Sequence, residues 1–300
     1  MLKIGIAGCG SWSNTVLKEI ENNKNFNLKS VFCRNYNSKK VKFDNSIRIY
    51  ENIESFFLEN INDCIYVAGT PELNLKAVKL AIKNKIPLIL EKPISNKSQN
   101  LEKIQFLTNK YKLIIIPNLT NYFSDSFYYL KNYVDNNFDD IKRIIIFEGG
   151  NGPYRKNIHP IWDWGFHSFS TLLTIFENKN FSNISKKEIK SNAITKDVIT
   201  RFKFSVESKI DVKIISGNLF KQKIRKFKII LKNNNVLESN MIDHKIYLNK
   251  KIVFKNSITP LQSLLNSFYK TIKESDTDYS KNLINISNKT TKILEKFYNC

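Results

Sequence analysis

An aspartate and a histidine lie four residues apart near the middle of the chain, within the segment His159-Pro160-Ile161-Trp162-Asp163-Trp164-Gly165-Phe166-His167. Pro160 suits a first helical position, because the N–H that proline lacks has no partner there, and we expect a helix from Pro160 to about Phe176. A spacing of four places Asp163 and His167 on one face of that helix. An imidazole beside a carboxylate can exchange a proton with a substrate hydroxyl. The pair alone is equally compatible with a helix-dipole carboxylate and a core histidine.

A glycine-rich turn, Gly8-Cys9-Gly10-Ser11-Trp12-Ser13, stands between a strand-like segment (3–7) and a helix-like segment (14–20). In this order the first glycine permits a tight turn, and the second lets the backbone approach a pyrophosphate at the helix N-terminus. Ser13 replaces the usual third glycine with another small residue, which weakens the match. The turn predicts binding of a dinucleotide.

The end of the second expected strand, residues 28–33, bears on the choice of cofactor. A dinucleotide-binding fold usually has an acidic residue there, which binds the ribose 2′-hydroxyl of NAD. This chain has Arg34 instead. An arginine can pair with a 2′-phosphate and stack on adenine, so Arg34 favours NADP over NAD. Arg34 is also compatible with one more surface base in a basic protein.

Strand and helix patterns alternate over the first part of the chain. The strands are apolar on both faces, which is typical of a parallel sheet covered by helices. Thr70-Pro71 follows the strand at 64–68, and Glu91-Lys92-Pro93 follows the strand at 86–90. Such sheets bind ligands at the carboxyl ends of their strands, and Pro93 restricts the backbone of Lys92. We expect a first domain over residues 1–118.

The pattern changes from residue 120 onward. A loop at 149–155 is expected to lead to the helix with the aspartate and the histidine. Short strands joined by polar turns follow, as in a mainly antiparallel sheet, and two helices end the chain. The Asn/Lys-rich residues 178–187 are expected to be surface loops. Residues 119–300 are expected to form a second domain of α+β class, whose last helix could pack back on the first.

Composition and charge exclude several classes of protein. An apolar content of 42% over 300 residues suffices for buried cores, and no apolar run reaches the ~18 residues of a membrane span. The net charge is +21, but the lysines never form a stripe interleaved with stacking aromatics, so we expect neither nucleic-acid nor membrane binding. A basic field would still favour a phosphorylated or nucleotide-linked substrate.

The cysteines are scattered and form no C-x-x-C pair; they are Cys9, Cys33, Cys64 and Cys300. We expect them to be small apolar side chains in a reducing compartment, not metal ligands or disulfides. The first residues, which turn glycine-rich by Gly8, do not resemble a signal peptide, so a cytoplasmic location is expected.

Four motifs, in this order, resemble the Gfo/Idh/MocA oxidoreductases, the family of glucose-fructose oxidoreductase and inositol dehydrogenase. They are Gly8-x-Gly10-x-Trp12, Thr70-Pro71, Glu91-Lys92-Pro93 and Asp163-x-Gly165-x-His167. The resemblance covers essentially the whole chain. It implies an α/β fold with a Rossmann domain that binds NADP or NAD, and an α+β domain with a mainly antiparallel open sheet. It also implies a homodimer or homotetramer that pairs through the open face of that sheet.

The resemblance also implies roles for single residues. Lys92, Asp163 and His167 would surround the nicotinamide and a sugar or cyclitol in a cleft between the domains. Asn74 stands where the family often has histidine, and we expect this change to alter only cofactor-side contacts. Tyr154 and Arg155 are candidates for substrate contact, although this loop could equally be plain surface. The residues implied to contact the cofactor are Gly8, Gly10, Ser11, Trp12, Arg34, Thr70, Pro71, Glu91 and Lys92.

The expected function is an NAD(P)-dependent transfer of hydride between the nicotinamide and a carbinol or ketone carbon of a sugar. Trp12 and the segment 162–167 look most like members that act on nucleotide-linked sugars. The alternative is a non-catalytic NAD(P)-binding protein of the same fold with a regulatory or structural role. Lys92, Asp163 and His167 argue against it, since a retired site has no reason to keep all three residue types.

Overall fold

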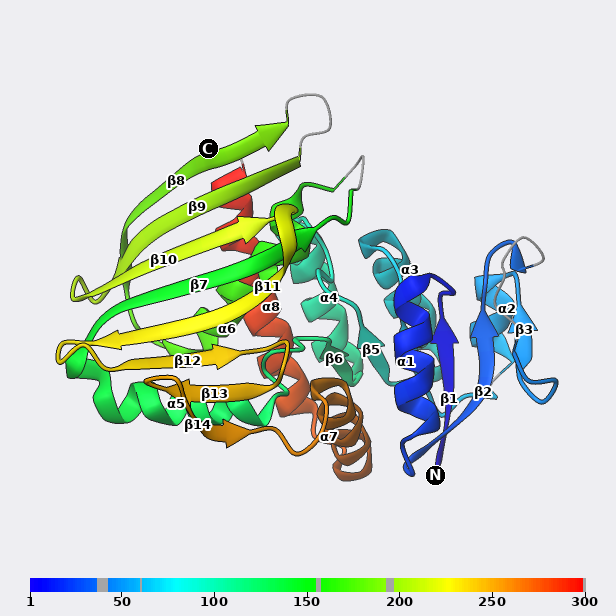
Figure 1. Cartoon of the computed structure of the whole chain (residues 1–300). Coiled ribbons are helices and arrows are strands. Elements are labelled where there is room, and N and C mark those ends of the chain that lie inside the picture. The colour runs from blue at the N-terminus through cyan, green and yellow to red at the C-terminus, as the bar shows by residue number, and fades with distance from the viewer. Residues whose placement is uncertain (37–42, 60, 155–157, 193–196, 299–300) are drawn as a thin grey trace. The chain divides into compact units, whose positions relative to one another are not determined.

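The computed structural model describes residues 1–36, 43–59, 61–154, 158–192 and 197–298 (Figure 1). The chain divides into two compact units. Unit 1 comprises residues 1–118 and 261–292, and unit 2 comprises residues 119–260 and 293–300. Within the described ranges, no helix is both long enough and apolar enough to cross a membrane.

Unit 1 contains a six-stranded parallel sheet in the order β3-β2-β1-β4-β5-β6. The strands are β1 (Leu2–Ala7), β2 (Phe26–Phe32), β3 (Arg48–Tyr50), β4 (Cys64–Val67), β5 (Leu88–Leu90) and β6 (Ile115–Pro117). Every residue of β4, β5 and β6 is buried, as in a sheet covered on both faces. The strand order reverses between β1 and β4, and sheets of this kind bind ligands beyond the carboxyl ends at such a reversal.

The helices of unit 1 come from both ends of the chain: α1 (Ser11–Glu21), α2 (Ile53–Leu58), α3 (Pro71–Asn84), α4 (Ser98–Tyr111), and most of α7 (Pro260–Glu274) and α8 (Thr277–Tyr298). Ser280 of α8 bonds both backbone groups of Ile115 in β6, each at 2.8 Å. Residues 261–292 therefore belong to unit 1.

Unit 2 contains an eight-stranded sheet in the order β14-β13-β12-β11-β7-β10-β9-β8. Strands β7 and β10 pair in parallel, and the other pairs of this sheet are antiparallel. The expected two-domain α/β fold is thus confirmed. The strands are β7 (Ile141–Asn151), β8 (Phe181–Asn192), β9 (Asp197–Val206), β10 (Ile210–Gly217), β11 (Leu219–Leu231), β12 (Val236–Asn240), β13 (Lys245–Leu248) and β14 (Lys251–Lys255).

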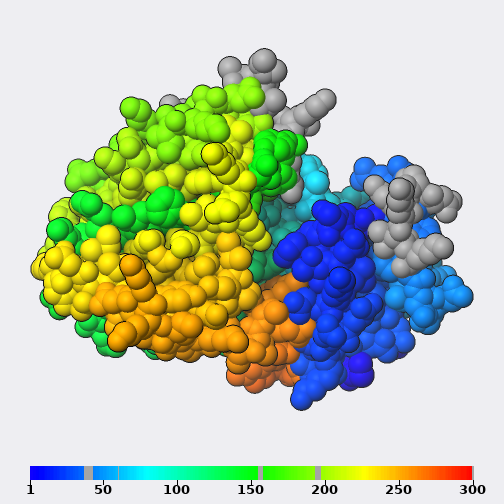
Figure 2. All heavy atoms as spheres, in the orientation of Figure 1, coloured from blue at the N-terminus to red at the C-terminus, as the bar shows by residue number. Residues whose placement is uncertain are grey.

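Helices lie against one face of the sheet of unit 2 (Figure 1), and the other face is formed by the strands themselves (Figures 1 and 2). The helical elements along this part of the chain are α5 (Asp125–Asn137), the 3₁₀ turn η2 (Phe138–Asp140), the π-helical turn η3 (Ile161–Gly165) and α6 (Phe166–Ile175). Strand β8 corrects the expectation of surface loops at 178–187. It forms the sheet's edge, pairs with β9 and has mostly exposed side chains, so its polar composition resembles that of a loop.

Candidate active site

The glycine turn between β1 and α1 lies where the strand order reverses. Gly8 has a φ of +132°, which side-chain-bearing residues rarely adopt. A Cβ on Gly8 would lie 2.4 Å from the carbonyl oxygen of Ala68, in the loop after β4. The two loops therefore approach so closely that only glycine fits. At Gly10, by contrast, an added Cβ would meet no atom within 4 Å.

The open space over Gly10 fits a diphosphate. Helix α1 begins at the next residue, Ser11, and its N-cap residue is Gly10, which has no side chain to cap the first turn. Backbone N–H groups at a helix N-terminus, together with the helix dipole, bind phosphate. Ser13, in the place of the third glycine, is buried at 1% exposure, so its small side chain packs without blocking the turn. The residues present thus fit the dinucleotide that the sequence predicted.

A disulfide joins Cys9 of the glycine turn to Cys33, the residue after β2, with 5.3 Å between the Cα atoms. This corrects the expectation of separate cysteines and removes the cysteine argument for a reducing compartment. The two residues are 24 apart in sequence, but the parallel pairing of β1 with β2 brings the strand ends together. Cys64 is free and buried, and Cys300 lies outside the described residues.

Three other predicted cofactor residues follow strands of the same sheet. Arg34 comes after β2, directly beside the disulfide, and its side chain is exposed. Thr70 is exposed at the N-cap of α3, and Pro71 is the first residue of that helix. Because carboxyl ends of parallel strands share one edge of a sheet, these residues and the glycine turn lie along that edge.

The carboxylate of Glu91, directly after β5, accepts three hydrogen bonds on Oε1. The donors are Trp12 Nε1 at 2.6 Å, Tyr66 Oη at 2.5 Å and Asn118 Nδ2 at 2.7 Å. Burial and the nearby Glu91 charge raise the pKa of Tyr66 well above its usual value, so its hydroxyl remains a donor. Through Trp12, this network ties the glycine turn to the turn that carries Lys92.

Asn74 holds the backbone of the Lys92 turn. Its Nδ2 lies 2.9 Å from the carbonyl oxygen of Glu91 and 3.2 Å from that of Ile94. The contacts of Asn74 thus lie in the turn that carries Glu91 and Lys92, two of the predicted cofactor residues. Residue 74 lies in the first turn of α3, and its buried side chain reaches the 91–94 turn.

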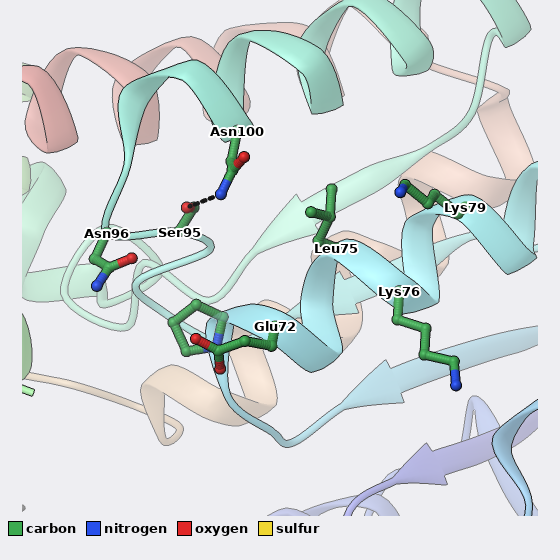
Figure 3. A pocket seen from close by; sticks show the side chains of 8 residues that line it. Glu72, Leu75, Lys76, Lys79, Ser95, Asn96 and Asn100 are labelled. Atoms are coloured by element: carbon green, nitrogen blue, oxygen red, sulfur yellow. Dashed lines mark hydrogen bonds between the residues drawn. The ribbon is translucent and has the colours of Figure 1, made fainter. Parts of the chain in front are cut away.

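A pocket of about 300 Å³ lies beside this part of unit 1 (Figure 3). Asn100 Nδ2 donates to Ser95 Oγ at 3.4 Å on its wall. Neither the glycine turn nor Lys92 lines it, so it is separate from the predicted cofactor residues, Pro71 excepted. Its lining residues are Pro71, Glu72, Leu75, Lys76, Lys79, Ser95, Asn96 and Asn100.

In unit 2, Asp163 lies on the π-helical turn η3, and His167 lies on α6, which continues it. The expected helix is thus confirmed for 166–175, whereas its first turn is π-helical and begins at Ile161. Wider turns of this kind occur often at functional sites. His167 is 8% exposed and Asp163 is partly exposed, so the imidazole is largely shielded from water.

An aromatic cluster anchors α6 to the sheet. The ring of Phe169, two residues after His167, packs on Phe202 and Phe204 of β9 with centroid separations of 5.3 and 6.1 Å. Phe297 of α8 packs on Phe169 at 5.4 Å. Buried aromatic pairs add about 0.5–1.5 kcal/mol each beyond the area they bury, so the cluster fixes the rotation of α6.

A series of polar contacts, called the relay below, links the strands of the sheet to the same helix. Arg225 of β11 pairs with the buried Glu148 of β7, with 2.5 Å between Nε and Oε1. Arg225 Nη2 also donates to Asn121 Oδ1 at 3.0 Å, and Asn121 Nδ2 donates to Thr171 Oγ1 at 3.2 Å. Thr171 Oγ1 in turn donates to the carbonyl oxygen of His167 at 2.7 Å. Sequence reasoning missed the relay, because no local pattern links residues on four separate elements.

His159 caps the beginning of the site helix. Its Nδ1 accepts a hydrogen bond from the Ile161 N–H at 3.2 Å, and its ring packs edge-on to Tyr298. Burial lowers the pKa of His159 below its usual value; Glu188 opposes this shift and Lys186 adds to it. The ring is therefore neutral at pH 7, as its role of acceptor requires.

The loop before the site helix is held at two points. Trp164 Nε1 donates to the Gly152 carbonyl at 3.0 Å, and Asn218 Nδ2 donates to the Pro153 carbonyl at 3.2 Å. Tyr154 follows with a side chain that is 58% exposed, and its hydroxyl donates to Asn151 Oδ1. The other candidate of this loop, Arg155, lies outside the described residues.

Solved structures share the fold of the whole chain. A dehydrogenase from Clostridium difficile is 19% identical, with a TM-score of 0.79 over 99% of each chain. UDP-N-acetylglucosamine 3-dehydrogenase from Acidithiobacillus ferrooxidans is 12% identical, with a TM-score of 0.78 over 97% of this chain and 96% of the other. The scyllo-inositol dehydrogenase from Lactobacillus casei, solved with NAD(H) and scyllo-inositol, is 15% identical, with a TM-score of 0.73 over 98% and 94%.

A family model matches the first part of the chain. No curated protein sequence matches the chain. Residues 2–119, which contain the glycine turn, Thr70-Pro71 and Glu91-Lys92-Pro93, match a model described as an oxidoreductase family with an NAD-binding Rossmann fold. The resemblance drawn from the motifs is thereby confirmed: residues 2–119 match this oxidoreductase family, and the whole chain shares its fold with solved dehydrogenases.

Proposed function

We propose that this oxidoreductase transfers a hydride between NADP or NAD and a carbinol or ketone carbon of a nucleotide-linked sugar. The observation that carries the proposal is the joint presence of Lys92, Asp163 and His167 with a glycine turn whose open space over Gly10 fits a diphosphate. By their names, two proteins of the same fold act on UDP-N-acetylglucosamine and scyllo-inositol. A net charge of +21 favours an anionic substrate.

The proposed cofactor site uses the edge of the sheet of unit 1. Bound nicotinamide supplies or accepts the hydride. The exposed guanidinium of Arg34 pairs with a 2′-phosphate, which favours NADP. The residues that would hold the cofactor are Gly8, Gly10, Ser11, Trp12, Arg34, Thr70, Pro71, Glu91 and Lys92.

The proton of the substrate hydroxyl requires a partner on the protein. We assign that role to His167, since an imidazole exchanges protons near neutral pH and its helix is anchored by Phe169 and Thr171. The ammonium group of Lys92 holds the same substrate oxygen and stabilises its developing negative charge. Asp163 orients a neighbouring hydroxyl. Tyr154 and Arg155 are proposed to contact the substrate.

The proposed assembly is a homodimer or homotetramer that pairs through the open face of the sheet of unit 2. That face is formed by strands without a covering helix (Figure 2). Sedimentation of the purified protein measures its mass in solution, and a monomer at all concentrations would refute the assembly.

The test of the proposed function is the His167→Asn variant, assayed with nucleotide sugars and with NADP and NAD in parallel. Turnover should fall by about 10²–10⁴-fold, because the proton acceptor is lost. Cofactor affinity should stay near wild type. His244→Asn is the matched control: the same change on a turn of unit 2, at a positive φ of 58° that asparagine tolerates.

The alternative, a non-catalytic NAD(P)-binding protein, predicts a different result. The cofactor would bind tightly, and no sugar, cyclitol or nucleotide sugar would change the absorbance of the reduced nicotinamide. Unchanged turnover in His167→Asn with a verified substrate would instead remove only the role of His167.

A further inference from the structure

The backbone on both sides of Lys92 is bonded to one buried side chain, that of Asn74. Its Nδ2 lies 2.9 Å from the Glu91 carbonyl oxygen, 3.2 Å from that of Ile94 and 3.5 Å from that of Pro93. The carboxamide has two N–H donors, enough for the two shorter bonds. These bonds end on the carbonyl directly before Lys92 and on the carbonyl two residues after it.

The carboxamide of Asn74 fits this place in only one orientation. Its Oδ1 is buried and has no hydrogen-bond partner among the described residues. Turning the amide over would point that oxygen at the same three carbonyl oxygens, which repel it. An unpartnered buried acceptor costs about 1–3 kcal/mol. The side chain therefore forgoes one hydrogen bond in order to hold the Lys92 turn with its donors.

Asn74 itself is fixed by its helix. It is 0% exposed, lies in the first turn of α3, and its own N–H donates to the Thr70 carbonyl at 3.0 Å. On the other side of the turn, the Glu91 carboxylate is held by its three donors. The backbone of Lys92 is thus held on one side by Asn74 of α3 and on the other by the hydrogen bonds of Glu91.

We propose that Asn74 is a positioning residue for Lys92. Its carboxamide sets the conformation of residues 91–94, so that the lysine side chain leaves the turn in one direction. This inference deepens the proposed function and rests on it only where turnover is measured. A displacement of about 1 Å in a catalytic group can lower turnover by about 10²-fold, so loss of these bonds should weaken catalysis without removing any reacting group.

The first test measures steady-state kinetics and cofactor affinity of Asn74→Ala and Asn74→His. Asn74→Ala should lower kcat by about 10- to 100-fold and leave cofactor affinity near wild type. Asn74→His keeps one ring N–H and should fall between Asn74→Ala and wild type, which also preserves the test if alanine impairs folding. Unchanged kcat in both folded variants, with only a lower melting temperature, would overturn the proposal.

The second test observes Lys92 without turnover. Reductive ¹³C-methylation labels the lysines, and the Lys92 signal is identified by its absence in Lys92→Arg. In Asn74→Ala and Asn74→His this signal should shift and titrate differently from wild type. If it shifts while the wild type turns over no sugar, the proposed function fails and the positioning role stands. A Lys92 signal identical to wild type in both variants would overturn the positioning role.

Asn84→Ala is the matched control for both tests. Asn84 ends the same helix, and its Nδ2 donates to one backbone carbonyl, that of Phe57, at 3.1 Å. Removing this bond should lower the melting temperature and leave the Lys92 signal and kcat unchanged. An equal effect of Asn84→Ala on the Lys92 signal would show that any loosening of α3 disturbs the lysine, and would overturn a specific role for Asn74.

Discussion

The residues of the proposed site are held differently in the two units. In unit 1, Gly8, Thr70 and Lys92 lie one to three residues after the ends of strands, and two of these loops are packed together, with a Cβ on Gly8 excluded by the Ala68 carbonyl. In unit 2, the helix with His167 is held by side chains of other elements. Aromatic rings of β9 pack on it, and a series of hydrogen bonds links it to a buried ion pair. Backbone geometry fixes the first region, and buried side chains fix the second.

The difference implies two kinds of sensitivity. Where loops pack through their backbones, a new side chain is tolerated only where space remains. Substitution of Gly8 and of Gly10, two residues apart, should therefore have very different effects. The stability of a helix held through a buried ion pair depends on both side chains of the pair, because removing one breaks the pair inside the protein. Variants in unit 2 should therefore change mainly the stability, whereas variants of the glycine turn in unit 1 can change either the stability or the affinity for the cofactor.

The largest effect is expected for Arg225→Met in unit 2. The change removes the guanidinium that pairs with the carboxylate of Glu148, which is 1% exposed, and breaking a buried pair in this way costs about 3–5 kcal/mol. Hydrogen exchange of the β7 and β11 amides measures the loss. The Asn121 contact is lost as well, so α6 should also exchange faster.

Arg143→Met is the matched control, since Arg143 pairs with Asp211 at 3.2 Å on the exposed surface of the same sheet. Exposed pairs contribute about 0–1 kcal/mol. Losses of equal size in Arg143→Met and Arg225→Met would contradict the view that the buried pair holds unit 2.

In unit 1, the double variant Cys9→Ser/Cys33→Ser should lower the free energy of unfolding by about 3 kcal/mol, because the disulfide closes a loop with a separation of 24 residues. Denaturant unfolding without reductant measures this loss. Reductant should produce a similar loss in the wild type and none in the double variant. A wild type that is indifferent to reductant would refute a stabilising disulfide.

The paired variants Gly8→Ala and Gly10→Ala test the glycine turn. Gly8→Ala should lower the free energy of unfolding of unit 1 by at least about 1–3 kcal/mol, because of its φ of +132° and the close Ala68 carbonyl. Gly10→Ala should cost little stability. It should weaken NADP binding by about tenfold or more, about 1.4 kcal/mol, since its methyl group enters the space that fits the diphosphate. Equal stability of the two variants would contradict the packing of these loops.

The smallest effect concerns the pH dependence of unit 2. The pKa of His159 is lowered in the folded state, so its stabilisation is fully present above its usual value of ~6.5 and is lost as the pH falls through the folded value. His159→Phe should cost about 0.5–1.5 kcal/mol at neutral pH through the lost hydrogen bond to the Ile161 N–H, and should flatten the decline toward pH 5.

The pKa of His244 is lowered too, by burial and by Arg225, so wild type and His159→Phe must be compared over the same pH range. Unfolding by denaturant at several pH values supplies both curves. Parallel curves, offset by a constant, would contradict a titrating His159.

Local patterns predicted unit 1 well. The strand before Gly8, the helix after it and the apolar strands before Thr70 and Glu91 have the expected types, since hydrophobic period and glycine are read over a few residues. Boundaries moved by a few residues; β5, for example, begins at Leu88. The polar strand β8 was missed because its exposed side chains form no apolar pattern that could be recognised in the sequence.

By itself, the sequence determined the glycine turn after β1, the motifs that follow β4 and β5, and the helix that carries His167, because each depends on neighbours within a turn or a strand. Only the tertiary structure decided that Cys9 meets Cys33, that Asn74 grips the Lys92 turn and that Arg225 meets Glu148, 77 residues away. Such contacts arise when strands and helices pack together in the folded chain. No spacing along the chain encodes them, because a side chain's partner is set by which elements are adjacent after folding.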